Sequence, residues 1–131
     1  MIQAILTSNS IEYAGIHRPQ DALLDRMVGI YTDYYGFETE VGIVMEHTGI
    51  SLKNAKRIVR VVRSIREKLP DAQKPGTRAC IMIAKGMQTS TEGFKINFEQ
   101  LCIDVIASKT SSPADMQEKK ELVMEIAAGI S

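Results

Sequence analysis

The stretch that most constrains the fold is residues 51–70, SLKNAKRIVRVVRSIREKLP. Ser51 can cap a helix at its start, and Pro70 ends one. Between them apolar residues return every three or four positions, the period of one buried helix face; they are Leu52, Ala55, Ile58, Val59, Val62, Ile65 and Leu69. This is the clearest helix signal in the sequence.

Four further stretches have helical patterns, over 37–49, 77–87, 97–108 and 112–131. Their end signals are of familiar kinds; they are Gly49 as a C-terminal stop, Asn97 with Gln100 as a capping box, and Ser112 as a cap before Pro113. Two short strands are predicted over 1–7 and 27–35, which are rich in apolar, β-branched and aromatic residues. The predicted fold class is mainly α with two short N-terminal strands. Two such strands cannot form a stable sheet alone.

The predicted central helix carries a row of cations on its other face. The row consists of Lys53, Lys56, Arg57, Arg60, Arg63 and Arg66. A row of this kind is either a solvated face or a binding surface, and the sequence alone favours neither.

Composition gives no sign of binding to nucleic acid or membranes through overall charge, of a membrane span, or of secretion. The 16 Lys and Arg residues balance the 16 Asp and Glu residues, so no global charge draws the chain to nucleic acid or to an anionic membrane. No apolar run reaches the roughly 18 residues of a membrane span, and the N-terminus lacks the features of a signal peptide. We therefore expect a cytoplasmic protein whose electrostatic interactions are local.

Several kinds of catalytic or metal site are also absent from the sequence. There is no nucleophile elbow and no phosphate-binding Gly-rich loop ending in Lys-Ser or Lys-Thr. His17 and His47 stand alone, without metal-ligand spacing. Cys80 and Cys102 lie in apolar helical patterns, and we predict that they are buried free thiols. No metal site is predicted.

Residues 6–27, LTSNSIEYAGIHRPQDALLDRM, carry the first motif with a family likeness. They resemble the stretch of MoxR-like AAA+ ATPases between sensor 1 and the arginine finger, most closely that of the gas vesicle GvpN family. The sensor position matches Asn9, and the DALLDR element ends at Arg26. The intervening loop with Glu, Gly and His matches Glu12, Gly15 and His17.

The likeness continues through the rest of the first 90 residues. The stretch KPGTRACIMIAK resembles the sensor-2 helix, with Arg78 as its cation. Ser10 departs from the family, which usually has Pro there, and the change falls in a loop. The resemblance implies the end of an AAA+ α/β core over 1–36 and a helical lid over 37–90. A helical extension over 91–131 would follow.

The resemblance also implies roles for three residues. Asn9 would position the attacking water and contact a phosphate oxygen, because its amide both donates and accepts. Arg26 would act in trans as an arginine finger, and Arg78 would contact the nucleotide of its own subunit. Ordinary alternatives exist for each: a helix cap for Asn9, a surface ion pair of Asp25 with Arg26, and a solvated Arg78.

In the intact family the resemblance implies ATP with Mg²⁺, a homo-oligomeric ring, other gas vesicle proteins as partners and a gas-vesicle-associated place in the cytoplasm. This chain lacks both the Walker A loop and the Walker B strand that hold ATP and Mg²⁺. We therefore predict that the isolated chain neither binds ATP tightly nor hydrolyses it.

Two alternatives remain open at this level. Residues 41–66 also fit a helix-turn-helix with Gly49 in the turn, which would bind DNA phosphates through cations of the row on its second helix; these are Lys53, Lys56, Arg57, Arg60 and Arg63. The other alternative is a helical adaptor domain without nucleotide chemistry.

Overall fold

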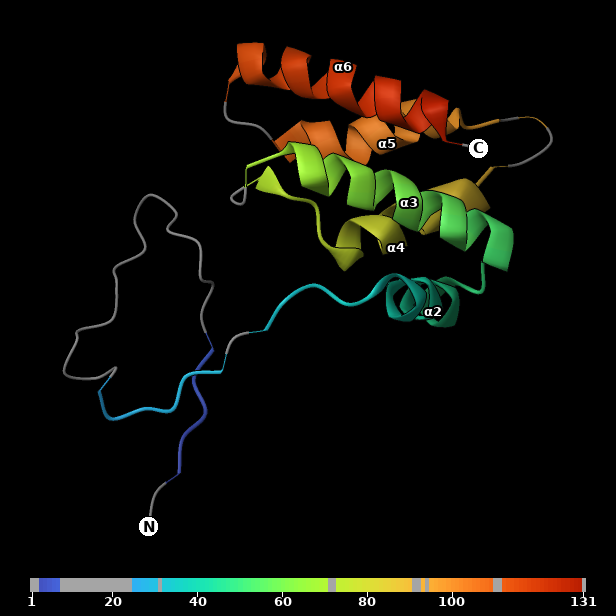
Figure 1. Cartoon of the computed structure of the whole chain (residues 1–131). Coiled ribbons are helices and arrows are strands. Elements are labelled where there is room, and N and C mark those ends of the chain that lie inside the picture. The colour runs from blue at the N-terminus through green and yellow to red at the C-terminus, as the bar shows by residue number, and fades with distance from the viewer. Residues whose placement is uncertain are drawn as a thin grey trace.

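The protein is described from a computed structural model, which covers residues 3–7, 25–30, 32–70, 73–90, 93, 95–109 and 112–130. Five α-helices and one short 3₁₀ turn make up the regular structure of these residues (Figure 1). They are α2 (Phe37–Thr48), α3 (Leu52–Lys68), α4 (Thr77–Gln88), α5 (Phe98–Ile106), η2 (Ala107–Lys109) and α6 (Pro113–Gly129). The five helices predicted from the sequence are confirmed.

The predicted helix ends are formed by the residues expected. The Ser51 side chain accepts a hydrogen bond from the Asn54 backbone N–H at 3.3 Å and so caps α3. Ser112 caps α6, and Pro113 occupies its first turn. Gly49 ends α2 with φ of 70°, a left-handed conformation that glycine adopts at little cost.

The capping box predicted at α5 is only half formed. The Asn97 side chain accepts from the Gln100 backbone N–H at 3.0 Å, as expected. The Gln100 side-chain amide, however, donates to Asp104 one turn further along instead of turning back to Asn97. The cap on the first turn of α5 therefore rests on Asn97 alone.

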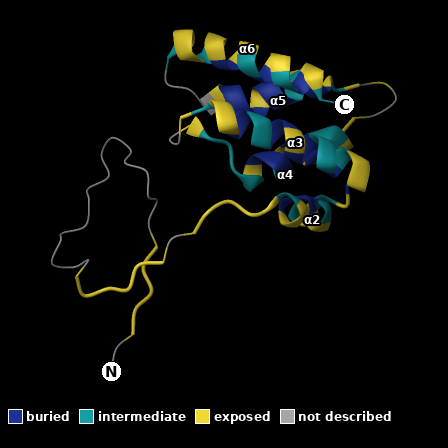
Figure 2. Cartoon of the chain, viewed as in Figure 1, coloured by how far each residue is buried: buried dark blue, intermediate teal, exposed yellow. Residues whose placement is uncertain are grey.

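Helix α3 lies at the centre of the helical body and packs against α2, α4 and α6 (Figure 1). Helix α4 also packs against α2 and α5, and α5 packs against α6. The α4–α5 contact is close at Gly86, where an added Cβ would lie 2.7 Å from a Leu101 methyl carbon. The buried side of α3 supplies the middle of the core (Figure 2); its residues are Ala55, Ile58, Val59, Val61, Val62 and Ile65.

The two predicted N-terminal strands are not found among the described residues. Residues 3–7, 28–30 and 32–36 have no regular structure. Ile5 is 94% exposed and Val28 is 92% exposed, so the apolar side chains that suggested buried strands face solvent (Figure 2). A strand needs a neighbouring backbone to satisfy its N–H and C=O groups, and no described segment pairs with these residues.

Within the described ranges no helix combines the length and the hydropathy needed to cross a membrane.

Candidate functional site

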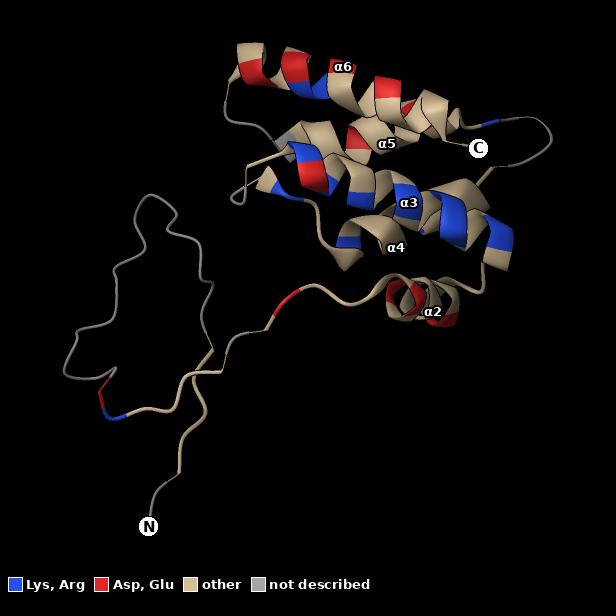
Figure 3. Cartoon of the chain, viewed as in Figure 1, with Lys and Arg blue, Asp and Glu red and all other residues tan. Residues whose placement is uncertain are grey.

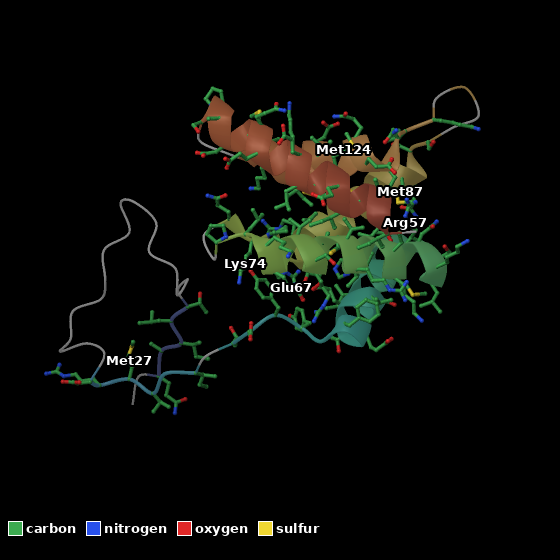
Figure 4. All side chains as sticks on the ribbon, turned by 45° about the horizontal axis from the view of Figure 1, so that its top comes forward. Met27, Arg57, Glu67, Lys74, Met87 and Met124 are labelled. Carbon is green, nitrogen blue, oxygen red and sulfur yellow. The ribbon has the colours of Figure 1, made fainter. Side chains whose placement is uncertain are left out.

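Of the three residues predicted to act on nucleotide, the structure describes two, Arg26 and Arg78, and it does not bring these two together. Asn9 lies outside the described residues. Arg26 is exposed in a turn, and its chain neighbour Met27 lies on the N-terminal segment, away from the helices (Figure 4). Arg78 is exposed in the first turn of α4, within the helical body. The structure therefore assembles only the surroundings of Arg78.

The start of α4 is held by a buried ion pair from the two helices beside it. Glu40 of α2 is fully buried, and both of its carboxylate oxygens accept hydrogen bonds of 3.1 Å from Nη2 of Arg66 on α3. Oε2 of Glu40 also accepts a hydrogen bond of 3.2 Å from the Thr77 hydroxyl, in the first turn of α4. This carboxylate places a negative charge at the positive end of α4, one residue before Arg78.

Arg66 extends the same cluster to two loop segments. Its Nε donates to the Pro75 carbonyl at 2.8 Å, just before α4. Its guanidinium carbon lies 4.0 Å from the centre of the Tyr34 ring, a cation–π contact with the segment that leads into α2. Nη1 is buried without a hydrogen-bond partner in the part of the chain that the structure describes. We call Glu40, Arg66, Thr77 and Tyr34 the α4-start cluster.

Sequence reasoning missed the α4-start cluster, although part of its signal was present. Glu40 precedes Val44 by one helical turn and so shares the buried face of α2. Arg66 was counted with the cationic row, yet it follows buried Val62 by one turn. A charged residue in register with a buried helix face is a signal for a buried ion pair.

The predicted row of cations on α3 is not a uniform solvent face. Nε of Arg57 donates to the Ile130 carbonyl at 3.2 Å, and its guanidinium carbon lies 3.9 Å from the Phe98 ring centre. Figure 4 shows Arg57 where α3 meets the end of α6. Nη1 of Arg63 donates to the Tyr35 carbonyl at 2.9 Å.

These contacts, with those of Arg66, weaken the helix-turn-helix alternative. In that alternative Arg57 and Arg63 would bind DNA phosphates, whereas in the structure both side chains donate hydrogen bonds within the molecule. The surface part of the row is Lys53, Lys56 and Arg60, of which Lys56 is half-buried.

Both cysteines are buried free thiols, as predicted. Burial raises the pKa of Cys80 to about 12, and the nearby Glu40 carboxylate adds to the rise. Burial likewise raises the pKa of Cys102 to about 12. Neither thiol is therefore suited to act as a nucleophile near neutral pH. Among the described residues no group of three or more His, Cys, Asp or Glu side chains could hold a metal ion.

The surroundings of Arg78 fit a contact to an anion such as a phosphate group. Arg78 is exposed and has no hydrogen-bond or ion-pair partner among the described residues. The N-cap residue Gly76 offers no side-chain hydrogen bond to the first turn of α4. Backbone N–H groups at a helix start and a neighbouring guanidinium are both donors to phosphate oxygens.

Comparison with curated proteins gives close relatives of one kind. The chain is 47% identical over 122 residues to the gas vesicle ATPase GvpN of Haloferax mediterranei, which is 92% of this chain and 35% of that protein. It is 46% identical over 120 residues to gas vesicle ATPase GvpN1 of Halobacterium salinarum, covering 91% of this chain and 34% of the relative. The gas vesicle ATPase GvpN of Ancylobacter aquaticus is 38% identical over 115 residues, 84% of this chain and 32% of its own length.

The chain thus spans about a third of the length of the curated relatives it matches. No family model matches it, and no solved structure does.

Proposed function

Because the chain belongs to the gas vesicle GvpN family over about a third of those proteins' length, we propose that it supplies the C-terminal part of an AAA+ ATPase, with a helical lid that senses nucleotide. Residues 1–36 would complete the nucleotide-binding core, 37–90 would form the lid, and 91–131 would extend it. The ATPase would act in a homo-oligomeric ring on other gas vesicle proteins, in association with the gas vesicle in the cytoplasm.

The observation that carries the proposal is the exposed guanidinium of Arg78 at a helix start that the α4-start cluster fixes. In this proposal Arg78 contacts a phosphate oxygen of ATP bound by its own subunit. The buried Glu40–Arg66 pair holds the first turn of α4, so the position of Arg78 follows that of α2 and α3. A change in phosphate contact at Arg78 would then move the helical body as one unit.

Two further residues complete the proposed site. Asn9 would orient the attacking water through its side-chain amide, which has both a donor and an acceptor. Arg26 would project to the nucleotide of a neighbouring subunit and stabilise charge on the transferring phosphoryl group. ATP with Mg²⁺ would supply that phosphoryl group. An arginine finger accelerates phosphoryl transfer by about 10³ to 10⁵ where it has been measured.

The first experiment tests whether the chain alone binds and hydrolyses ATP. Isothermal titration with Mg²⁺-ATP and a phosphate-release assay should show neither tight binding nor turnover, because the sequence has no Gly-rich phosphate loop. ATP turnover by the purified 131-residue chain that disappears in Asn9→Ala or Arg26→Ala would contradict the prediction that the chain alone is inactive.

The second experiment joins the chain to the part of a relative that it does not match. A chimaera joins this chain to the remaining part of the Haloferax mediterranei relative, and its ATPase rate is compared with those of Arg78→Ala and Lys85→Ala. Lys85 is a matched control because it is an exposed cation in the last turn of the same helix. We expect Arg78→Ala to lower the rate at least about tenfold and Lys85→Ala to leave it unchanged. Equal rates for the two variants would remove Arg78 from the proposed site.

A further inference from the structure

The outer faces of α3 and α6 carry rows of opposite charge with the same spacing. On α3 the row is Lys53, Lys56 and Arg60, and on α6 it is Glu118, Glu121 and Glu125. In each row the second residue lies three positions after the first, and the third lies seven positions after the first. Each row therefore lies along one helix face and spans about 10 Å. Figure 3 shows mostly basic charged residues along the ribbon of α3 and mostly acidic ones along that of α6.

Among the described residues the two rows form no ion pair with each other. The buried pair of Arg66 with Glu40 involves neither row. Glu121 accepts a hydrogen bond of 3.2 Å from the neutral Gln117 side chain. Arg60 lies 5.8 Å from the Phe37 ring centre and remains exposed. Both rows can therefore meet charges from outside the molecule.

An apolar feature accompanies each row. Between α5 and α6 lies an open groove of about 440 Å³, whose lining includes the apolar side chains of Ile103 and Met124 beside the carboxylates of Glu121 and Glu125. Two glutamines and Lys120 complete its lining. Met124 is 44% exposed in this groove.

Leu52 is the matching feature on α3. It was expected in the buried face of this helix, yet it is 49% exposed, beside Lys53. An exposed leucine next to cations complements an exposed methionine next to carboxylates, since apolar contact excludes water from the centre while charges pair at the edge.

We propose that these surfaces bind each other between two copies of this chain, with α3 of one copy lying antiparallel on α6 of the next. This arrangement pairs Lys53 with Glu125 of the second copy and Arg60 with Glu118 of the second copy. At 100° per residue, Leu52 and Met124 lie on the same side of their respective rows. The antiparallel arrangement therefore brings the two apolar side chains together.

The charge balance favours a second copy over other partners. A nucleic acid would account for the basic row only, and a basic peptide for the acidic row only. A second copy accounts for both rows and for their equal spacing. The contact joins two different surfaces, so repeated copies form a ring or an open chain. The inference adds a subunit contact to the proposed function, but it involves no nucleotide and can be tested without it.

The test is sedimentation velocity of the whole 131-residue chain at 50 mM and 500 mM NaCl, up to about 1 mM protein. We expect association with a dissociation constant of roughly 10 µM to 1 mM at low salt, because exposed ion pairs are individually weak. High salt should weaken association severalfold. Reversal of either row, by Lys53→Glu with Lys56→Glu or by Glu121→Lys with Glu125→Lys, should weaken it about tenfold or more.

The decisive sample is an equimolar mixture of the two reversed double variants. Each is expected to be monomeric alone, because its like charges face each other across the contact. In the mixture the reversed α3 row of one variant, now mainly acidic, pairs with the reversed α6 row of the other, now mainly basic, while the unchanged basic and acidic rows pair as in the original chain. The mixture should therefore associate again, with the two variants alternating. Circular dichroism of each variant verifies that it is folded.

The matched control is the double variant Glu46→Lys with Lys85→Glu, which changes exposed charges on α2 and α4 and should associate like the original chain. The proposal is overturned if the chain stays monomeric to about 1 mM at low salt. It is also overturned by association that survives both reversals, which would point to the exposed apolar N-terminal residues, or by a mixture that stays monomeric. Duplex DNA binding lost with Lys53→Glu, in a chain that does not associate, would favour nucleic acid instead.

Discussion

Nη2 of Arg66 lies 3.1 Å from each carboxylate oxygen of Glu40, at a place where the glutamate has no solvent exposure. The pair joins α3 to α2, and the Thr77 hydroxyl bound to the same carboxylate joins both to α4. Three helices therefore meet at one buried negative charge and one buried positive charge, each of which needs the other.

Replacing Glu40 by alanine should be strongly destabilising. The change leaves the Arg66 guanidinium buried, already with one unpartnered nitrogen among the described residues. Loss of one partner of a buried ion pair costs about 3–5 kcal/mol. Urea unfolding followed by circular dichroism would measure the change in the free energy of unfolding.

Two further variants separate charge burial from other effects of this change. Glu38→Ala alters an exposed glutamate of the same helix and should change stability by less than about 0.5 kcal/mol. The double variant Glu40→Leu with Arg66→Leu removes both charges and should recover much of the loss. A double variant as unstable as Glu40→Ala would mean that packing, and not the uncompensated charge, dominates.

The helix boundaries could be predicted because local signals determine them. Ser51, Asn97 and Ser112 each cap a helix through a hydrogen bond that spans three residues, so a short window of sequence contains the whole interaction. The prediction of the N-terminal strands was wrong because strand formation is not determined locally. Residues such as Ile5 and Val28 have strand propensity, but strand pairing depends on other segments, and no described segment pairs with them.

In the candidate site, too, the locally determined residue was predicted and the residues that depend on helix packing were missed. Arg78 was predicted as a cation in the first turn of a helix, and it stands there. The residues that hold this helix start were missed, because Glu40 and Arg66 are 26 positions apart and their pairing depends on how α2 packs on α3. Arg57 was assigned to a surface row because helical spacing cannot show that the end of α6 would cover it.

Arg57→Ala should destabilise the fold, although the residue belongs to a row that looks solvated in sequence. The variant loses the hydrogen bond to the Ile130 carbonyl and the cation–π contact with Phe98 at 3.9 Å. Together these should cost about 1–2 kcal/mol. The matched variant Arg60→Ala loses only a distant ring contact of 5.8 Å from an exposed position and should cost less than about 0.5 kcal/mol. Thermal unfolding in 500 mM NaCl compares them; equal losses would contradict the assignment of Arg57 to the α3–α6 contact.

Two glycines close together in the chain should respond oppositely to alanine. Gly49 has φ of 70°, so alanine there is strained and should lower the free energy of unfolding by about 1 kcal/mol or more. Gly42 lies in the middle of α2 with open space around an added Cβ, so Gly42→Ala should raise it by about 0.5–1 kcal/mol. Chemical unfolding of both variants measures the two changes in the free energy of unfolding. If both changes had the same sign, the left-handed conformation at the end of α2 would be contradicted.

The buried thiols should make the fold less stable in alkali. Cys80 and Cys102 have an ordinary pKa of 9.0, and burial raises both values to about 12. Between these values the unfolded chain releases the thiol protons and the folded chain keeps them. The unfolded state is therefore favoured as pH rises from 9 toward 12, and below pH 9 the thiols contribute no pH dependence.

Each thiol should lower the free energy of unfolding by about 1.4 kcal/mol per pH unit within that window. Urea unfolding at pH 8, 9 and 10 measures the slope, and the same series on Cys102→Ala removes one thiol while lysine and tyrosine titration stays the same in both proteins. The variant should lose stability less steeply above pH 9. Parallel slopes for the two proteins would mean that Cys102 titrates alike in the folded and unfolded chain, which its complete burial argues against.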